Sequence, residues 1–157
     1  MDILYLVSQD INAYDFLKKT LKEKFNISMP KIIKGEHGKP YFEKSGIYFN
    51  ISHTNGLQVI AISDSEVGVD VEKIKSVNLK IASRFTKEEH DYVTDLWRFF
   101  EVWTKKEAYL KYKGTGISGG LKSFNVFDVT PEIMTFKYGE YVISVCSEKK
   151  FEIEVVK

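Results

Sequence analysis

The spacing of apolar and polar residues predicts short strands and helices in a definite order. A continuous apolar run at residues 3–7 predicts a buried strand. Apolar positions then recur at helical spacing over residues 12–25, where Asn12 is placed to cap the helix. Three more strands are expected, each bounded by residues that favour turns: 47–51, 57–62 and 66–72.

The second half of the chain begins with helical signals and ends with strands. Residues 77–85 predict a short helix, the segment from Thr86 to Glu89 has the spacing of a capping box, and residues 96–112 predict a longer helix. Further strands are expected at 122–129, 133–138, 140–146 and 151–156. This order predicts an α+β protein of two related halves, residues 1–65 and 66–157. Each half is expected to pack a helix on a small, mostly antiparallel sheet, with a ligand site between the halves.

Composition narrows the function without changing the fold. The 157 residues are 43% hydrophobic and 14% aromatic, which is typical of one globular core. A net charge of +1 gives no global field to attract nucleic acid or a membrane surface. One cysteine, Cys146, excludes an internal disulfide and fits a reducing compartment. No apolar run approaches the roughly 20 residues of a membrane span. We therefore expect a soluble, cytoplasmic protein with neither nucleic-acid nor membrane partners.

The strand expected at 66–72 carries the first candidate site. Because side chains alternate along a strand, three valines share one face, while Gly68, Asp70 and Glu72 share the other. The two carboxylates would lie about 7 Å apart along the strand. They would suit a hard cation such as Mg²⁺, because they repel each other unless a cation lies between them. The alternative is a half-buried strand whose polar face meets water.

The helix expected at 96–112 carries the second candidate site. Its apolar stripe is formed by Leu96, Phe99, Phe100, Trp103 and Leu110. Glu107 continues this stripe, and a carboxylate on an inward face is costly unless it is paired or bound to a metal. Two other interpretations are a capping box with Thr104, which a stripe already begun at Leu96 disfavours, and a solvated ion pair with Lys111. The position of Glu107 on the stripe favours a functional role.

Other polar residues give weaker signals. Ser52 and His53 follow a strand; no G-x-S-x-G elbow accompanies them, so an anion-binding loop or a plain turn remains. The glycines between 114 and 120 lack the flanking strand of a phosphate-binding loop and are interpreted as a helix stop. His37 and His90 have no partners at metal-ligand spacing.

Taken together, several of these segments resemble a known enzyme family. VGVDVEKI (67–74) and WTKKEAYLKYKG (103–114) resemble the paired signature of the phosphopantetheinyl transferase superfamily, a G-[ILV]-D-x-E strand and a W-x-x-K-E-[AS]-x-x-K helix. GKPYF (38–42) and FNISHT (49–54) resemble two more of its landmarks, in the right order. Because Asp70 lies deep in the chain, the pattern resembles the long form of the family, typified by the activator of surfactin synthetase, in a shortened version. That form is a pseudo-twofold monomer with one site between its halves.

The resemblance implies an activity. The enzyme would transfer the 4′-phosphopantetheine group of coenzyme A to a serine of an apo acyl or peptidyl carrier protein, releasing 3′,5′-adenosine bisphosphate. Two rivals are a catalytically idle homologue that only binds coenzyme A or a carrier domain, and a metal-dependent phosphohydrolase. The presence of Asp70, Glu72, Glu107 and Lys111 argues against the first rival.

The resemblance also implies a role for each site residue. Asp70, Glu72 and Glu107 would hold Mg²⁺, or Mn²⁺, together with the pyrophosphate of coenzyme A. Glu107 would also accept the proton of the carrier serine, and Lys111 would balance charge on the departing phosphate. The remaining candidates would bind coenzyme A itself: Lys39 and Pro40 at its adenine and phosphate end, and Ser52 and His53 at its 3′-phosphate.

Overall fold

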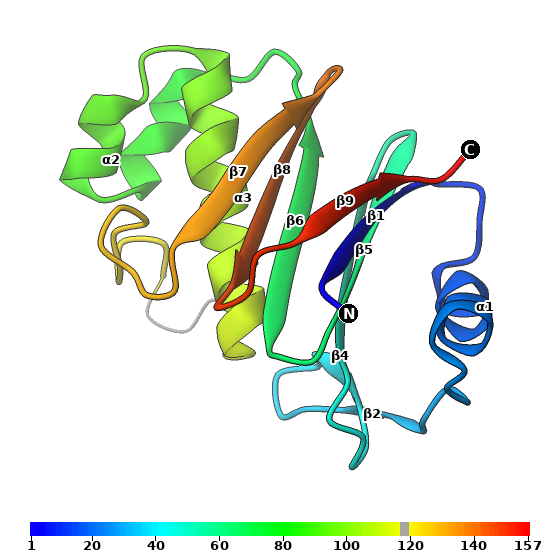
Figure 1. Cartoon of the computed structure of the whole chain (residues 1–157). Coiled ribbons are helices and arrows are strands. Elements are labelled where there is room, and N and C mark those ends of the chain that lie inside the picture. Colours follow the sequence, from blue (N-terminus) through cyan, green and yellow to red (C-terminus); the bar gives the residue numbers. More distant parts are fainter. Residues whose placement is uncertain (117–119) are drawn as a thin grey trace.

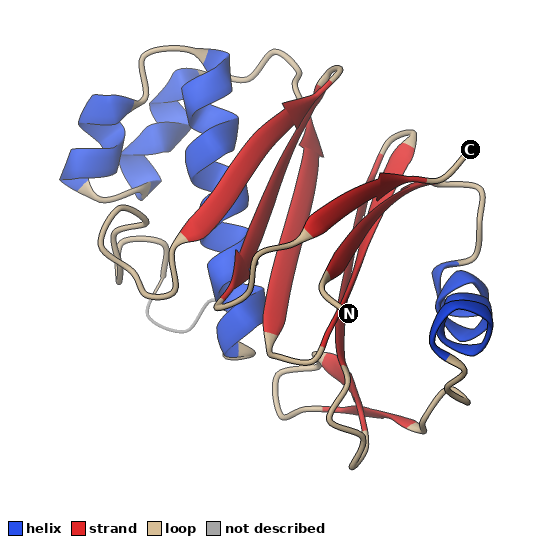
Figure 2. Cartoon of the chain, in the orientation of Figure 1, coloured by secondary structure: helices blue, strands red, loops and turns tan. Residues whose placement is uncertain are grey.

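The two larger of three β-sheets pack face to face, with helices on their outer sides (Figure 1). The computed structural model describes residues 1–116 and 120–157. Figure 2 shows the resulting order of layers, in which the sheets lie between helix α1 on one side and helices α2 and α3 on the other. The arrangement is the α+β fold that the sequence predicts.

The first sheet has the strand order β4-β5-β1-β9. Its strands are β1 (Ile3–Ser8), β4 (Tyr48–Thr54), β5 (Leu57–Ser63) and β9 (Glu152–Val155). Strand β5 pairs antiparallel with both β1 and β4, whereas β9 pairs parallel with β1. Helix α1 (Ala13–Phe25) begins where Asn12 accepts a hydrogen bond from the Asp15 backbone N–H. A separate hairpin, β2 (Ile32–Lys34) and β3 (Pro40–Phe42), lies beside this sheet.

The second sheet has the order β6-β8-β7 and is antiparallel. Its strands are β6 (Val67–Lys73), β7 (Ile133–Tyr138) and β8 (Tyr141–Ser147). Helix α3 (Leu96–Lys113) packs on its outer face and ends at Gly114, which adopts a left-handed conformation with φ of 66°. A short 3₁₀ helix, η1 (Leu79–Arg84), and helix α2 (Lys87–Tyr92) precede α3, and the capping box of Thr86 and Glu89 is present.

Three apolar clusters fill the spaces between the layers. The central cluster joins inward residues of both sheets, including Leu4 and Val59 from the first and Val69 and Ile143 from the second. The other two clusters lie under α1 and under α3. Because side chains alternate along each strand, the residues on the opposite face of β6 point away from the central cluster and toward α3. This alternation places Asp70 and Glu72 under the long helix.

The two sheets meet along strands β4 and β6. The backbone N–H of Val69 donates to Asn50 Oδ1 at 2.8 Å, and that of Val71 donates to Ser52 Oγ at 3.2 Å. Side chains of β4 therefore satisfy these two N–H groups on the outer edge of β6, in place of a neighbouring strand.

Two expectations from the sequence need correction, and one pair of strands was missed. The strand expected at 122–129 is wrong, because this segment forms turns whose backbone groups bind the side chains of Lys106 and Glu89. The strand expected at 47–51 extends to Thr54, so Ser52 and His53 lie within a strand and not in a loop. The short strands β2 and β3 were not expected.

Other expectations concern particular segments. The helix-stop interpretation is confirmed at Gly114, while Gly119 lies outside the described residues. The strand expected at 151–156 is present as β9, and it joins the sheet formed by the first part of the chain. Within residues 1–116 and 120–157, no helix has both the length and the apolar character needed to cross a membrane.

Candidate active site

Gly68 allows helix α3 to lie directly against strand β6. A Cβ atom at this position would come within 2.1 Å of the Ala108 carbonyl oxygen and 2.3 Å of the Tyr112 backbone nitrogen. No side chain fits at these distances without moving the helix. Because Gly68 has no side chain, Asp70 and Glu72 on β6 can lie close to Glu107 on α3.

A cavity of about 380 Å³ forms where β4, β6 and α3 meet. We call it the smaller cavity, because a larger one adjoins it. Ile51 and Trp103 line it together with six of the residues predicted for the site: Ser52, His53, Asp70, Glu72, Glu107 and Lys111. The structure thus brings together residues from three segments that are far apart in the sequence.

Asp70 is the most buried acid of this group. Its Oδ1 accepts a hydrogen bond from Ser52 Oγ at 3.0 Å and lies 3.7 Å from Lys111 Nζ. Its Oδ2 is buried and has no hydrogen-bond partner among the described residues. Burial raises the pKa of Asp70 to about 7; Lys111 and the Ser52 hydroxyl oppose the rise, whereas Glu72 and Glu107 add to it. A buried carboxylate with a free oxygen is the arrangement that a bound cation would stabilise.

The other two carboxylates are also shifted toward their neutral forms. Burial raises the pKa of Glu72, against a lowering hydrogen bond from Trp103. Burial likewise raises the pKa of Glu107, and the charge of Lys111 opposes that shift. The ammonium group of Lys111 lies between Asp70 Oδ1 and the Ile51 carbonyl oxygen, which is 3.5 Å from Nζ. Lys111 therefore places a positive charge beside this acidic cluster, and Lys75 also opposes the rise in the pKa of Glu72.

The donor set fits a hard divalent cation. All three acids offer carboxylate oxygens, the ligands that Mg²⁺ and Mn²⁺ prefer, and Oδ2 of Asp70 is an acceptor that no described residue uses. Across the part of the chain that the structure describes, no three Asp, Glu, His or Cys side chains are already gathered at ligand spacing. Binding would therefore require Asp70, Glu72 and Glu107 to draw closer together around the ion.

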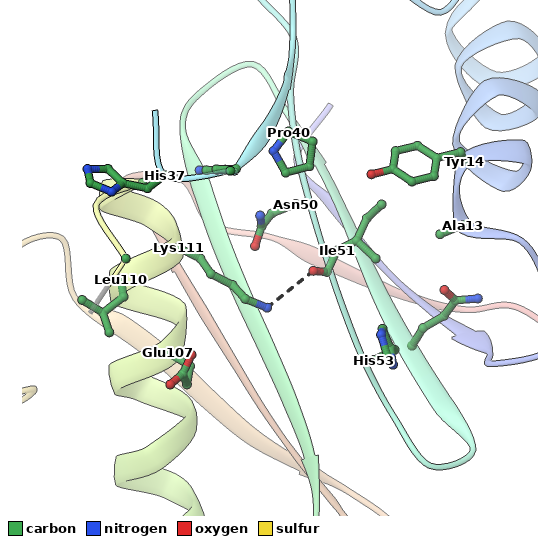
Figure 3. A pocket seen from close by; sticks show the side chains of 15 residues that line it. Ala13, Tyr14, His37, Pro40, Asn50, Ile51, His53, Glu107, Leu110 and Lys111 are labelled. Carbon is green, nitrogen blue, oxygen red and sulfur yellow. Dashed lines mark hydrogen bonds between the residues drawn. The ribbon is translucent and has the colours of Figure 1, made fainter. Parts of the chain in front are cut away.

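A larger cavity of about 510 Å³ adjoins the smaller one and shares Ile51, His53, Glu107 and Lys111 with it. In Figure 3, Lys111 reaches from α3 to the Ile51 carbonyl, between His37 and His53. Other lining residues are Ala13, Tyr14, Gly38, Lys39, Pro40, Asn50, Gln58, Leu110, Gly114 and Gly116. The larger cavity combines apolar walls with imidazole and ammonium groups, so it can hold a ligand that has both apolar and anionic parts.

Lys39 and Pro40 both line the larger cavity, but the charge of Lys39 is already engaged. Its Nζ lies 2.6 Å from Glu66 Oε1 and donates to the Val67 carbonyl oxygen at 3.0 Å. The side chain is only 14% exposed, and burial lowers its pKa, opposed by Glu66. Lys39 therefore joins the loop before β3 to the segment that leads into β6.

The sequence interpretation missed residues that support or line the site. Tyr14, His37 and Asn50 line the larger cavity, and the only signal for Asn50 was its place in the FNISHT segment. Lys106 and Glu89 form a fully buried ion pair at 2.8 Å that connects α3 to α2. Lys106 falls within the W-x-x-K-E segment, which could have indicated it.

Comparison with known proteins decides the family. A family model described as the 4′-phosphopantetheinyl transferase superfamily matches residues 66–151. The chain belongs to this superfamily. Within it, the chain is 37% identical over 118 residues to the 4′-phosphopantetheinyl transferase gsp of Aneurinibacillus migulanus, covering 69% of this chain and 49% of that protein.

Two Bacillus proteins are similar to this superfamily member to the same degree. Over 118 residues it is 36% identical to the 4′-phosphopantetheinyl transferase psf-1 of Bacillus pumilus, covering 69% of this chain and 51% of that protein. Over 101 residues it is 37% identical to the 4′-phosphopantetheinyl transferase Sfp of Bacillus subtilis (strain 168), covering 58% of this chain and 44% of that protein. The match spans about half the length of these curated relatives. The resemblance drawn from the sequence motifs is confirmed.

Proposed function

We propose that this chain is a Mg²⁺-dependent 4′-phosphopantetheinyl transferase that acts on coenzyme A and an apo acyl or peptidyl carrier protein. The observation that carries the proposal is the buried Oδ2 of Asp70, which has no partner among the described residues and lies in a cavity that Glu72, Glu107 and Lys111 also line. A protein that only bound coenzyme A would not need this cluster of acids beside a lysine. Mn²⁺ has the same ligand preferences and is expected to substitute.

Coenzyme A would occupy the larger cavity, with its pyrophosphate toward the smaller one. Pro40, Tyr14 and Leu110 offer apolar contacts for the adenine end, and His53 offers a donor to the 3′-phosphate. The pyrophosphate would then lie near Glu107 and Lys111, which line both cavities, and near Asp70 and Glu72, which line the smaller one. Asp70, Glu72 and Glu107 would hold the cation there.

Glu107 would accept the proton of the carrier serine, and Lys111 would balance the negative charge on the departing phosphate. The serine oxygen of the carrier attacks the phosphorus that bears pantetheine, and the bond to the leaving 3′,5′-adenosine bisphosphate breaks. Glu107 takes the serine proton, directly or through a water, and its raised pKa suits that role. Lys111 turns from Asp70 toward the departing phosphate, where negative charge increases. When bound, the cation neutralises the charge that develops on the phosphate oxygens.

We also propose that residues 1–65 and 66–157 act as two halves of one monomer in the cytoplasm. The proposal is supported by the smaller cavity, which is lined by residues of β4 from the first range and by residues of β6 and α3 from the second. The chain has a single, buried cysteine, which fits a reducing compartment.

The proposal is tested by weighing carrier proteins. Purified protein is incubated with coenzyme A, Mg²⁺ and a panel of apo acyl and peptidyl carriers, and each carrier is analysed by mass spectrometry. We expect a mass gain of one phosphopantetheine group that EDTA abolishes and Mg²⁺ restores. Binding of coenzyme A with no mass gain on any carrier would indicate the idle homologue. Consumption of coenzyme A without a carrier would indicate a phosphohydrolase.

A further inference from the structure

One hydroxyl group connects the two sheets at the candidate metal site. Ser52, on β4, is 6% exposed, and its Oγ lies 3.0 Å from Asp70 Oδ1 and 3.2 Å from the backbone nitrogen of Val71, both on β6. The N–H of Val71 can only donate, so Oγ accepts from it. The single hydroxyl hydrogen of Ser52 is then available to the carboxylate of Asp70, which accepts it.

This hydrogen bond makes the two oxygens of Asp70 different. Ser52 and Lys111 both lie against Oδ1, whereas Oδ2 has no partner among the described residues. Lys111 Nζ is 3.7 Å from Oδ1, too far for a hydrogen bond, so Ser52 is the one hydrogen-bond donor to Asp70 among the described residues. Without this donor the carboxylate could rotate about its last bond and exchange the two oxygens. With the Ser52 donor in place, Oδ2 keeps its lone pairs unused. A hard cation requires such an oxygen in a fixed position.

We propose that Ser52 is a positioning residue for the divalent cation: its hydroxyl holds Oδ1 of Asp70 so that Oδ2 is presented to the ion. The inference rests on the proposed function, because it concerns the same cation. It differs from the contact with the 3′-phosphate of coenzyme A that the family resemblance implies, because the hydroxyl hydrogen of Ser52 is directed to Asp70 in the structure.

Asn50 provides a matched comparison two residues earlier on β4. Its Oδ1 accepts from the backbone N–H of Val69 at 2.8 Å, so it makes the same kind of contact between β4 and β6. It has no hydrogen bond to Asp70 among the described residues. Loss of Asn50 therefore weakens the junction of the sheets without changing the carboxylate. A purely structural role for Ser52 predicts that both substitutions have the same effect on the cation.

The test measures binding of Mn²⁺ alone, from the loss of the free-ion signal in electron paramagnetic resonance. The parent protein is compared with Ser52→Ala, Ser52→Thr and Asn50→Ala, without coenzyme A or carrier, and thermal unfolding is recorded for each. We expect Ser52→Ala to weaken the Kd for Mn²⁺ by roughly 10-fold, as for other groups that orient metal ligands. Ser52→Thr keeps the hydroxyl and should restore binding. Asn50→Ala should lower the Tm but keep the Kd of the parent.

Two results would overturn the inference while leaving the proposed function intact: an unchanged Kd in Ser52→Ala, or an equal loss in Asn50→Ala. If Ser52→Ala does not fold, Ser52→Cys replaces it, because a thiol is a weaker donor of similar shape. If the folded parent protein binds no Mn²⁺ alone, the comparison is repeated with coenzyme A, whose pyrophosphate shares the ion in the proposed function. Absence of Mn²⁺ binding there too would overturn the metal site, and with it both the proposed function and this inference.

Discussion

Ser52 and Asp70 are joined by a 3.0 Å hydrogen bond that crosses from one sheet to the other. Ser52 belongs to the strand that reaches the larger cavity, and Asp70 belongs to the strand that carries the acidic cluster. The contact joins β4, which carries Ser52 and His53, to β6, which carries the predicted metal ligands Asp70 and Glu72. Substitutions on either side of it should therefore have separable effects, which the following predictions describe.

Asp70→Asn should abolish Mg²⁺-dependent transfer while the protein stays folded. The amide keeps the shape of the side chain but removes the charge and one strong ligand oxygen, so the remaining acids cannot complete the coordination of the ion. Asp64→Asn is a matched control, because Asp64 is an exposed acid paired only with Lys149 among the described contacts. Transfer is measured as carrier mass gain over a range of Mg²⁺ concentrations. Unchanged turnover of Asp70→Asn at low Mg²⁺ would remove Asp70 from the metal site.

The metal-free protein should lose stability as pH rises toward neutrality. The folded-state pKa of Asp70, about 7, lies above its usual value of 3.8, so between these values the folded protein binds more protons than the unfolded chain. The contribution of Asp70 to the free energy of unfolding therefore falls from about pH 4 to about pH 7 and is then constant. Glu72 and Glu107, whose pKa values are also raised, act in the same direction.

Urea unfolding with EDTA at pH 5 and pH 8 measures this effect in the parent and in Asp70→Asn. The free energy of unfolding of the variant should exceed that of the parent by more at pH 8 than at pH 5. Adding Mg²⁺ should raise the stability of the parent at pH 8 and leave the variant unchanged. A difference between the two proteins that is the same at both pH values would contradict the raised pKa of Asp70.

Glu107→Gln should reduce the transfer rate by roughly 10²-fold or more, because the amide can neither accept the serine proton nor provide its charge to the ion. The free energy of unfolding of the metal-free protein should be equal or slightly higher, since a half-buried charge is removed. Glu132→Gln, at an exposed position before β7, is the control. A variant that loses stability and keeps its activity would show that Glu107 only pairs with Lys111.

Gly68→Ala should disturb both stability and activity. Its Cβ would lie 2.1 Å from the Ala108 carbonyl, so α3 must move away from β6, at a cost of typically about 1–3 kcal/mol for such overpacking. Gly35→Ala is the control, because a Cβ there meets its nearest atom at an ordinary 3.6 Å. Chemical denaturation measures both variants. Equal stabilities for the two would show that the approach of α3 to β6 is not as close as the structure has it.

His53 and Lys39 should affect coenzyme A binding in different ways. The parent should bind coenzyme A about 10-fold more tightly than 3′-dephospho-coenzyme A, a difference of about 1.4 kcal/mol. His53→Ala should shrink this preference, and the effect should weaken at high salt. Lys39→Met should weaken the binding of coenzyme A and of 3′-dephospho-coenzyme A to the same extent, because the Lys39 ammonium is paired with Glu66 and not with the 3′-phosphate. Calorimetry with both ligands measures the preference. If Lys39→Met shrinks it instead, the lysine leaves Glu66 for the phosphate.

The local spacing of apolar and polar residues determined much of the secondary structure of this protein. Helices α1 and α3, the capping box at Thr86 and the alternation of β6 all follow from spacing within a few residues, so the sequence alone predicts them. The same rules place Asp70 and Glu72 on one face of a strand and Glu107 on the inward stripe of a helix. Short-range geometry depends only on the rise and rotation of the chain, which each element imposes on its own residues.

Only the tertiary structure decided which distant groups meet. The ammonium of Lys106 holds the carbonyls of Leu121 and Phe124, so that segment forms turns where its composition predicted a strand. Strand β9 joins β1 at the other end of the chain, and Lys39 pairs with Glu66. Ser52 meets Asp70 only because β4 and β6 lie side by side. A buried donor binds an acceptor that is near in space, wherever that acceptor lies in the sequence. A local sequence pattern therefore does not predict which distant groups form hydrogen bonds.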